Sequence, residues 1–178
     1  MRPIELDGLV TKGDSLAWAL FSPCGRYRYA LGRMWDEPDG MVSRPVFCVT
    51  CLNPSTADHL KDHDDPTLRK LIHYGKQEGC GALLLRNVGA FRTTYPRELR
   101  AAGDPVGPRN IEVLRLDPML SLRVAAWGRP VSAKLHRRFA ESRWAAGCSR
   151  VFGLTKGGHP KHPLYLTNAT RVTKWVPQ

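Results

Sequence analysis

The chain has 178 residues, a length that fits one domain whose core can fold without disulfides or metals. It carries 27 Lys and Arg against 16 Asp and Glu, and the formal net charge of +11 indicates a polyanionic partner such as nucleic acid. The alternative is a basic tail that aids solubility or binds RNA weakly, because no Asp or Glu follows Glu141. No apolar run approaches the roughly 18–20 residues of a membrane span, and the N-terminus does not resemble a signal peptide, so we expect a cytoplasmic protein.

The apolar pattern predicts a hairpin, then strands that alternate with helices. The hairpin covers 17–21 and 26–33 around the turn Ser22-Pro23-Cys24-Gly25, after a leader over 1–16. Buried strands are expected over 46–52, 81–88, 122–128 and 150–154. Helices are expected from an Asp65 N-cap to near Gly79, near 108–116, and over 130–146. This order predicts one α/β domain over 1–178, a three-layer α/β/α fold with a central, mostly parallel sheet, on which residues 1–44 pack as leader and hairpin.

The cysteines and the acidic stretch raise the question of a metal. Five cysteines, an odd number, predict reduced thiols, and Cys48 and Cys51 are three apart in a strand, so we expect them on opposite faces. A hard-cation site remains conceivable in the stretch that contains His59, Asp62, His63, Asp64 and Asp65. Core cysteines and a solvated acidic loop are the favoured interpretation, so we predict no metal and no cofactor.

Each predicted strand ends in a segment that suits a binding site. These segments are Asn53-Pro54, Asn87, Trp127-Gly128 and the loop 155–165. Because the carboxyl ends of parallel strands share one sheet edge, we expect the four segments to converge on one cleft. Pro54 ends its strand and holds Asn53 at that edge, where an amide can orient water but cannot act as a strong base.

The residues at these ends suit the release of a base from deoxyribose. Signatures of serine hydrolases, phosphate-binding loops, zinc proteases and zinc deaminases are missing from the sequence. In base release the sugar becomes cationic and the base leaves with negative charge. Asn53 would orient the attacking water, neutral His162 would donate to the departing base, and Asn87 would read the edge of an extruded base.

The order of these motifs resembles the uracil-DNA glycosylase superfamily, especially its mismatch-specific thymine/uracil branch. Leu-Asn-Pro-Ser at 52–55 looks like the first motif, Gly-x-Asn-Pro-Gly, and residues 86–93 are similar to the branch's Thr-Asn-x-Val-x-Arg-x-Thr stretch. Residues 124–128 resemble the Trp-Gly strand of the uracil enzymes, and His-Pro-Leu-Tyr-Leu at 162–166 looks like the second motif, His-Pro-Ser-Pro-Leu. The chain departs from the superfamily at Cys51, which replaces the first-motif Gly, and at Leu164-Tyr165, which replace Ser-Pro.

A closer resemblance is to a family of small bacterial and phage proteins described as a domain of unknown function. Its motifs are Leu-Asn-Pro-Ser-Thr-Ala-Asp, Asp-Asp-Pro-Thr, Pro-Val-Gly-Pro-x-Asn, Ala-Trp-Gly and His-Pro-Leu-Tyr, and all occur here between residues 52 and 165. The chain is identified as a member of that family.

The glycosylase resemblance implies a monofunctional enzyme that flips out and excises a modified pyrimidine and leaves an abasic site, with a role in defence against phages. Ser55 stands where uracil-specific enzymes carry a bulky aromatic, which implies tolerance of 5-substituents: hydroxymethylated or glucosylated cytosine, or a uracil or thymine mispair. The alternatives are a non-catalytic nucleic-acid binding module, or a metal-dependent nucleotide hydrolase using Asp62, Asp64 and Asp65.

The site residues predicted from motifs and resemblance fall into three groups. The catalytic group is Asn53, His162, Asp58 and Asp65, of which the two Asp are either helix caps or general bases. The base-contacting group is Ser55, Asn87, Phe91 and Tyr165, with Phe91 also a candidate core residue. The DNA-contacting group is Arg92, Lys134, Arg138, Lys156, His159, Lys161 and Leu164. Leu164, Tyr165 or Leu166 would be the wedge that enters the duplex.

Overall fold

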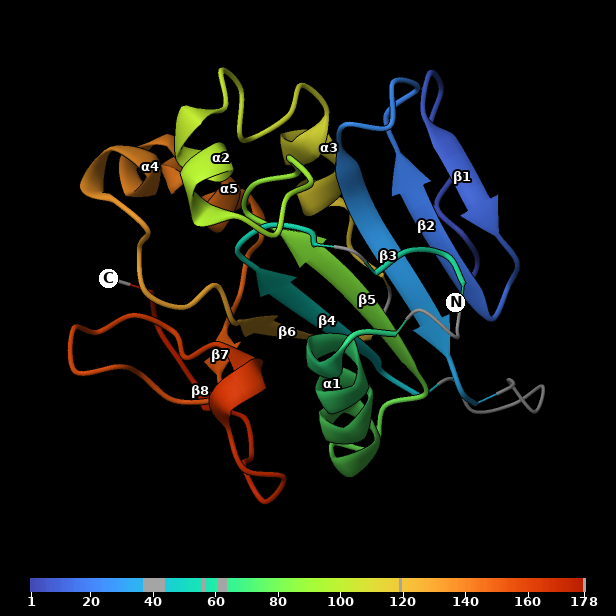
Figure 1. The fold of residues 1–178 in the computed structure, drawn as a ribbon. Helices are drawn as coiled ribbons and strands as arrows, with labels where there is room; N and C mark the ends of the chain where they lie inside the picture. Colours follow the sequence, from blue (N-terminus) through green and yellow to red (C-terminus); the bar gives the residue numbers. More distant parts are fainter. Residues whose placement is uncertain (37–43, 56, 61–63, 119, 178) are drawn as a thin grey trace.

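The computed structural model describes residues 1–36, 44–55, 57–60, 64–118 and 120–177, which form a mixed α/β fold around one eight-stranded sheet (Figure 1). The strand order is β1-β2-β3-β5-β4-β6-β7-β8. The strands are β1 (Val10–Gly13), β2 (Ala17–Phe21), β3 (Arg28–Met34), β4 (Val46–Cys51), β5 (Ala82–Asn87), β6 (Ser121–Ala125), β7 (Arg150–Val151) and β8 (Thr173–Lys174). The predicted hairpin is therefore confirmed as β2 and β3, and the predicted strands are confirmed as β4 to β7, with β7 only two residues long.

The sheet is mixed rather than mostly parallel. Strands β5, β4, β6 and β7 are parallel neighbours, as predicted, but β1, β2, β3 and β5 pair antiparallel, and so do β7 and β8. Four of the seven pairings in the described chain are antiparallel, so the prediction of a mostly parallel sheet is wrong. The physical reason is that unpaired backbone groups at a sheet edge favour further pairing. The hairpin extends the sheet beyond β5, the leader adds β1 at that edge, and the C-terminal segment adds β8 at the other edge.

The helices expected after Asp65 and near 108–116 are present, whereas two further short helices, over 96–101 and 163–165, were not predicted. Helix α1 (Pro66–Gln77) has the predicted Asp65 N-cap, whose Oδ1 accepts from the backbone N–H of Leu68 at 2.8 Å. The short helices are α2 (Pro96–Ala101), α3 (Asn110–Arg115), α4 (Ala133–Arg138), α5 (Ala140–Ala145) and the 3-10 helix η2 (Pro163–Tyr165). The single helix expected over 130–146 is wrong, because the chain leaves helical geometry at buried Phe139 between α4 and α5.

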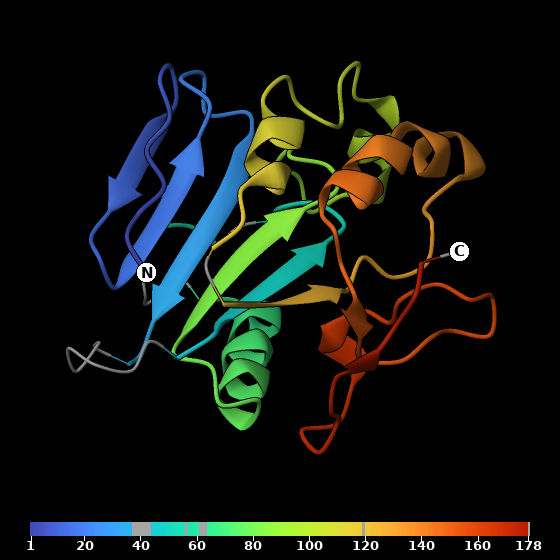
Figure 2. The same ribbon diagram turned by 180° about the vertical axis from the view of Figure 1, so that it is seen from behind.

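Alternating side chains of the central strands pack into hydrophobic cores on the two faces of the sheet. Phe47, Val49 and Cys51 pack with the apolar side of α1. Val46 and Cys48 pack on the opposite face, in a cluster that includes Val113 of α3. Figures 1 and 2 show α1 on one side of the sheet and α3 to α5 on the other. The prediction that Cys48 and Cys51 face opposite sides is confirmed. No helix of the described chain is long and apolar enough to cross a membrane.

Candidate functional site

The loops that follow the parallel strands are joined to one another at the carboxyl edge of the sheet. The ends of β4 and β5 lie in register, with Cys51 opposite Asn87. The two following loops are linked by the N–H of Thr93, which donates to the Pro54 carbonyl at 3.0 Å. The loops after β6 and β7 also meet, since a Cβ placed on Gly128 would lie 3.4 Å from the Cβ of His162. The structure thus brings together the segments that the sequence predicts to converge.

The Asn53 amide is held by two backbone carbonyls. Its Nδ2 donates to the carbonyl of Thr93 at 2.7 Å and to that of Pro54 at 3.2 Å. These two acceptors fix which end of the amide is the nitrogen, because only Nδ2 can donate. Both amide protons are therefore used within the protein, and the group that Asn53 offers to a ligand is the acceptor oxygen Oδ1. An acceptor is the group needed to orient a water molecule.

Asp65 connects Ser55 to the start of helix α1. One carboxylate oxygen caps the helix, and the other accepts from the Ser55 hydroxyl at 3.0 Å. A negative charge at a helix N-terminus is favourable, because the helix dipole and the unpaired N–H groups there are positive. The carboxylate of Asp65 is therefore fixed in position, close to the loop that carries Asn53.

His162 is a neutral hydrogen-bond donor in this geometry. It precedes η2, and its Nδ1 accepts from the backbone N–H of Leu164 at 3.3 Å, so that the ring proton resides on Nε2. Burial lowers the pKa of His162, and the negative charge of nearby Asp65 opposes this shift in part. The ring of Tyr165 lies 6.4 Å from the His162 ring, and Tyr165 is 85% exposed.

Asn87 contributes a buried polar group at the end of β5. Its side-chain Nδ2 has no partner among the described residues, although Asn87 is buried. Its backbone carbonyl and that of Val88 accept from Nδ2 of fully buried Asn110, at 3.0 and 3.2 Å. An unpaired buried donor is costly, which makes the Asn87 amide a group that a ligand oxygen would satisfy. Sequence reasoning missed Asn110 as a residue that fixes this strand end, although it closes the Pro-Val-Gly-Pro-x-Asn motif.

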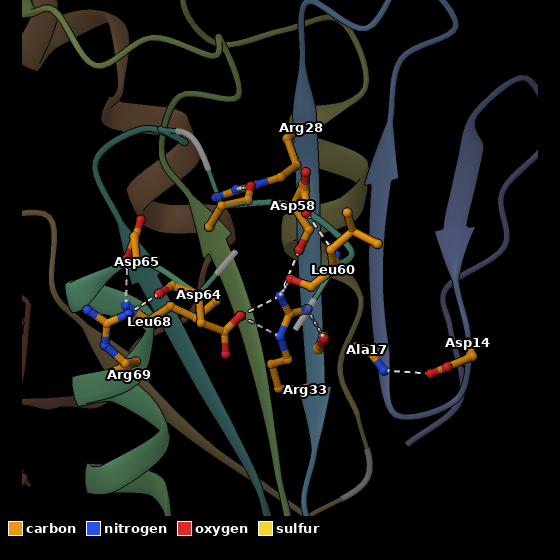
Figure 3. Close-up of polar contacts among 12 residues, drawn as sticks. Asp14, Ala17, Arg28, Arg33, Asp58, Leu60, Asp64, Asp65, Leu68 and Arg69 are labelled. Carbon is orange, nitrogen blue, oxygen red and sulfur yellow. Dashed lines mark hydrogen bonds and ion pairs between the residues drawn. The ribbon is translucent and has the colours of Figure 1, made fainter. Parts of the chain in front are cut away.

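Two buried arginines on β3 hold the loop that follows the Asn-Pro-Ser motif (Figure 3). Arg33 forms an ion pair with Asp64, with its Nη2 2.6 Å from Oδ1, and also donates to the carbonyls of Asp58 and Leu60. Arg28 donates to the carbonyl of Ala57. Burial lowers the pKa of Arg28 to about 10, so it remains a cation at neutral pH. Neither arginine was singled out from the sequence, although charged residues in an otherwise apolar strand indicate buried groups that need hydrogen-bonding partners.

Three predicted site residues are engaged by the hairpin. Asp58 Oδ1 accepts from the N–H of Leu60 at 2.8 Å, and Asp58 lines a pocket of about 170 Å³ with Arg92. Arg92 donates to the carbonyl of Gly25 at 3.0 Å, and its guanidinium lies 5.0 Å from the Phe21 ring. Phe91 packs edge-on against Tyr27 at 6.1 Å, which places it in the core rather than beside His162.

The predicted DNA-contacting residues fall into two groups. Lys156, His159, Lys161 and Leu164 lie on or beside the loop after β7, and the two lysines are exposed. Lys134 is exposed on α4. Arg138 donates to the carbonyls of Ala102 and Gly103, so it ties α4 to the end of α2.

The acidic stretch offers an incomplete set of metal ligands. Within the described chain no three His, Cys, Asp or Glu residues gather as a candidate metal cluster. Asp64 is paired with Arg33 and Asp65 caps α1, while Asp62 and His63 lie outside the described residues. All five cysteines are free thiols.

Fold and site together define a mixed α/β protein with a polar, cation-rich site at the carboxyl edge of its parallel strands. Residues 28–164 match the family described as "Protein of unknown function (DUF1643)", and because they make up more than three quarters of the chain, it belongs to that family. The matched segment contains Arg28, Asn53, Asp65 and His162. Comparisons with curated proteins and with solved structures gave no match.

Proposed function

We propose that this protein is a DNA glycosylase that extrudes a modified pyrimidine and hydrolyses its N-glycosidic bond. The observation that carries the proposal is that the loops at this sheet edge hold an acceptor, Asn53 Oδ1, whose amide protons are both used within the protein, and a neutral donor, His162 Nε2–H. Hydrolytic base release needs an acceptor for the attacking water and a donor for the departing base.

In the proposed reaction, water held by Asn53 forms a bond to C1′ of the deoxyribose as the bond from C1′ to the base nitrogen breaks. The electron pair of that bond leaves with the base, where the His162 N–H stabilises the negative charge that develops on the ring oxygen. The fixed carboxylate of Asp65 favours the cationic sugar and accepts the water proton. The products are the free base and an abasic site, with no strand cleavage.

The described site also supports the proposed substrate class. The unpaired Nδ2 of Asn87 would donate to a carbonyl oxygen on the edge of an extruded pyrimidine. Ser55 is small and its hydroxyl is directed to Asp65, so it leaves room for a substituent at C5. Uracil, mispaired thymine, hydroxymethylcytosine and its glucoside are therefore the substrates to test. A role in defence against phages with such bases is part of the proposal.

Other features fit a glycosylase-like arrangement bound to DNA. The four parallel strands, with α1 on one face and α3 to α5 on the other, support the three-layer arrangement of the uracil-DNA glycosylase superfamily. The net charge of +11 suits DNA phosphates. Exposed Tyr165 suits insertion into the base stack better than Leu166, which packs against the core cluster on the α1 face.

The test is to incubate the protein, with a chelator present, on DNAs that each carry one of the four candidate bases. We expect alkali-labile sites from the wild type, none from Asn53→Ala, and unchanged activity from the control Asn168→Ala, whose side chain is on an exposed turn. Binding of every substrate without base release would refute the proposal in favour of a nucleic-acid reader. Activity that the chelator abolishes would refute it in favour of a metal-dependent hydrolase.

A further inference from the structure

A large surface hollow lies beside the proposed site, between helix α5, the loop after β7 and the residues that follow β8. Its volume is about 820 Å³, and it adjoins a second hollow of about 410 Å³, with which it shares Gly157 and His159. We call the two hollows together the tryptophan groove, after Trp127, Trp144 and Trp175, which line the larger one. A space of this size accommodates one or more nucleotides.

Aromatic rings are concentrated in the tryptophan groove. Trp127 and Trp175 pack edge-on with ring centroids 5.9 Å apart, and His136 and His159 do the same at 5.5 Å. Trp144 contributes a ring that is 76% exposed. Of the eight exposed large hydrophobic side chains in the described chain, three line this groove, Trp144, Leu154 and Val176. Exposed apolar surface gathered in one hollow marks a binding site rather than scattered surface residues.

The described side chains that line the tryptophan groove are positively charged or neutral. Its described lining includes Arg129, Arg143 and Lys156 and contains no Asp or Glu. Burial, aided by the charge of Arg143, lowers the pKa of His136, so this ring is a neutral aromatic surface. Aromatic faces interleaved with cations complement nucleic acid strands, whose bases stack and whose phosphates need positive charge.

The groove adjoins the loop that carries His162. Trp127 and Arg129 line it and flank Gly128, where an added Cβ would lie 3.4 Å from the Cβ of His162. Lys161, next to His162 in the chain, is bonded through its backbone N–H to the carbonyl of Gly153 at 2.9 Å. A strand that left the catalytic site along these loops would enter the tryptophan groove.

We propose that the tryptophan groove binds single-stranded DNA next to the nucleotide in the catalytic site, so that the protein prefers an unpaired strand. The choice of DNA as the ligand rests on the proposed glycosylase function. Unpaired bases would stack on exposed Trp144 and on half-buried Trp175, which packs edge-on against buried Trp127, and phosphates would lie against Arg129 and Lys156. In duplex DNA the base faces are covered by their neighbours, so a stacking platform of this kind favours the single strand.

The proposal is tested by fluorescence anisotropy of a dye-labelled, unmodified oligothymidine, with the full chain and with the matched duplex as competitor. We expect the single strand to bind more tightly than the duplex, and Trp144→Ala to weaken it about 5- to 150-fold, the range for loss of one base-stacking ring. Trp144→Phe should restore most of the affinity, because it keeps an aromatic face. Both variants change an exposed residue, and Leu120→Ala, at another exposed apolar position, should bind like the wild type.

The charge contribution is read from the dependence of affinity on salt. Lys156→Ala should lower the slope of log K against log salt by about 0.7, the value for one phosphate contact on a single strand. Lys12→Ala removes the same charge from β1, at the opposite edge of the sheet from β7 and β8, and should leave the slope unchanged.

Equal binding of single strand and duplex, or wild-type binding by Trp144→Ala, would overturn the proposal. Tighter binding of oligouridine RNA than of the DNA would overturn it in favour of an RNA site. Because the oligonucleotide is unmodified, the outcome does not depend on base release, so failure of this proposal and failure of the proposed glycosylase are distinguishable.

Discussion

Removing the charge of Asp64 should destabilise the fold, because Arg33 would then be buried without its counter-ion. The Arg33 side chain is 4% exposed and that of Asp64 is 16% exposed. Arg33 bonds to Asp64 through Nε at 2.9 Å and through Nη2 at 2.6 Å. These bonds hold the segment between the Asn-Pro-Ser motif and helix α1 against strand β3, as Figure 3 shows.

The expected loss follows from burial. Breaking a buried ion pair by removing one partner costs about 3–5 kcal/mol, and partial exposure of Asp64 lets water replace some of the lost interaction. We therefore expect Asp64→Asn to lower the free energy of unfolding by about 3 kcal/mol, which for a chain of this length lowers Tm by roughly 6–12 °C. Arg33 keeps the carbonyls of Gly32, Asp58 and Leu60 as acceptors, so the variant should still fold.

Urea unfolding of Asp64→Asn, Arg33→Met and the double variant measures the pair directly. The double variant should be more stable than the sum of the single losses predicts, by about 2 kcal/mol, because each single change leaves the partner unpaired. Glu141→Gln serves as control, since it breaks the exposed pair with Arg115 and should cost less than about 1 kcal/mol. Additive losses at Arg33 and Asp64, or a loss at Asp64 no larger than at Glu141, would refute this reasoning.

Three further outcomes are expected. Gly128→Ala should cost about 1–2 kcal/mol in thermal unfolding, because φ is +74°, and should impair base release, because relief of that strain would shift a loop whose new Cβ lies 3.4 Å from the Cβ of His162. Gly25→Ala, with φ +70° and open space, should cost the same stability and leave base release intact. Burial lowers the pKa of His162 below the ordinary 6.5, so the unfolded chain binds its proton more readily and stability should fall as the pH drops below 6.5. His162→Gln should flatten part of that fall in urea unfolding. Asp65→Ala should lose about 1 kcal/mol of stability with the helix cap, whereas Asp65→Asn should keep it. Asp65→Asn also removes the carboxylate charge, so NMR titration should show a lower pKa for His162. Equal stability of the two variants would contradict the capping role.

Much of the local structure could be predicted from the sequence. The strands β4 and β5, the hairpin of β2 and β3, and the start of α1 at Asp65 all depend on patterns within a few neighbouring residues, such as an apolar run or an Asp before a Pro. The meeting of the segments that follow the parallel strands, Asn53-Pro54, Asn87, Trp127-Gly128 and the loop 155–165, was also predictable, because parallel strands place their carboxyl ends at one edge.

The remaining features depend on contacts between distant parts of the chain. Strand β1 pairs with β2 although its residues are mostly exposed and carry no apolar alternation. The break between α4 and α5 falls at buried Phe139, and the helical pattern of the sequence does not reveal it. Asn110 reaches Asn87 across 23 positions of sequence, and only the fold shows that its amide serves the end of β5.

The sequence by itself therefore determined the strand ends near Asn53 and Asn87 and the Pro after His162 that begins a turn, because these features are set by local backbone chemistry. Only the tertiary structure decided what surrounds these residues: that both amide protons of Asn53 are donated within the protein, that half-buried His162 has a lowered pKa, and that Arg33 pairs with Asp64. It also gathered Trp127, Trp144 and Trp175 into one groove. Burial and hydrogen-bond partners arise from packing of residues far apart in the chain, and no local pattern encodes them.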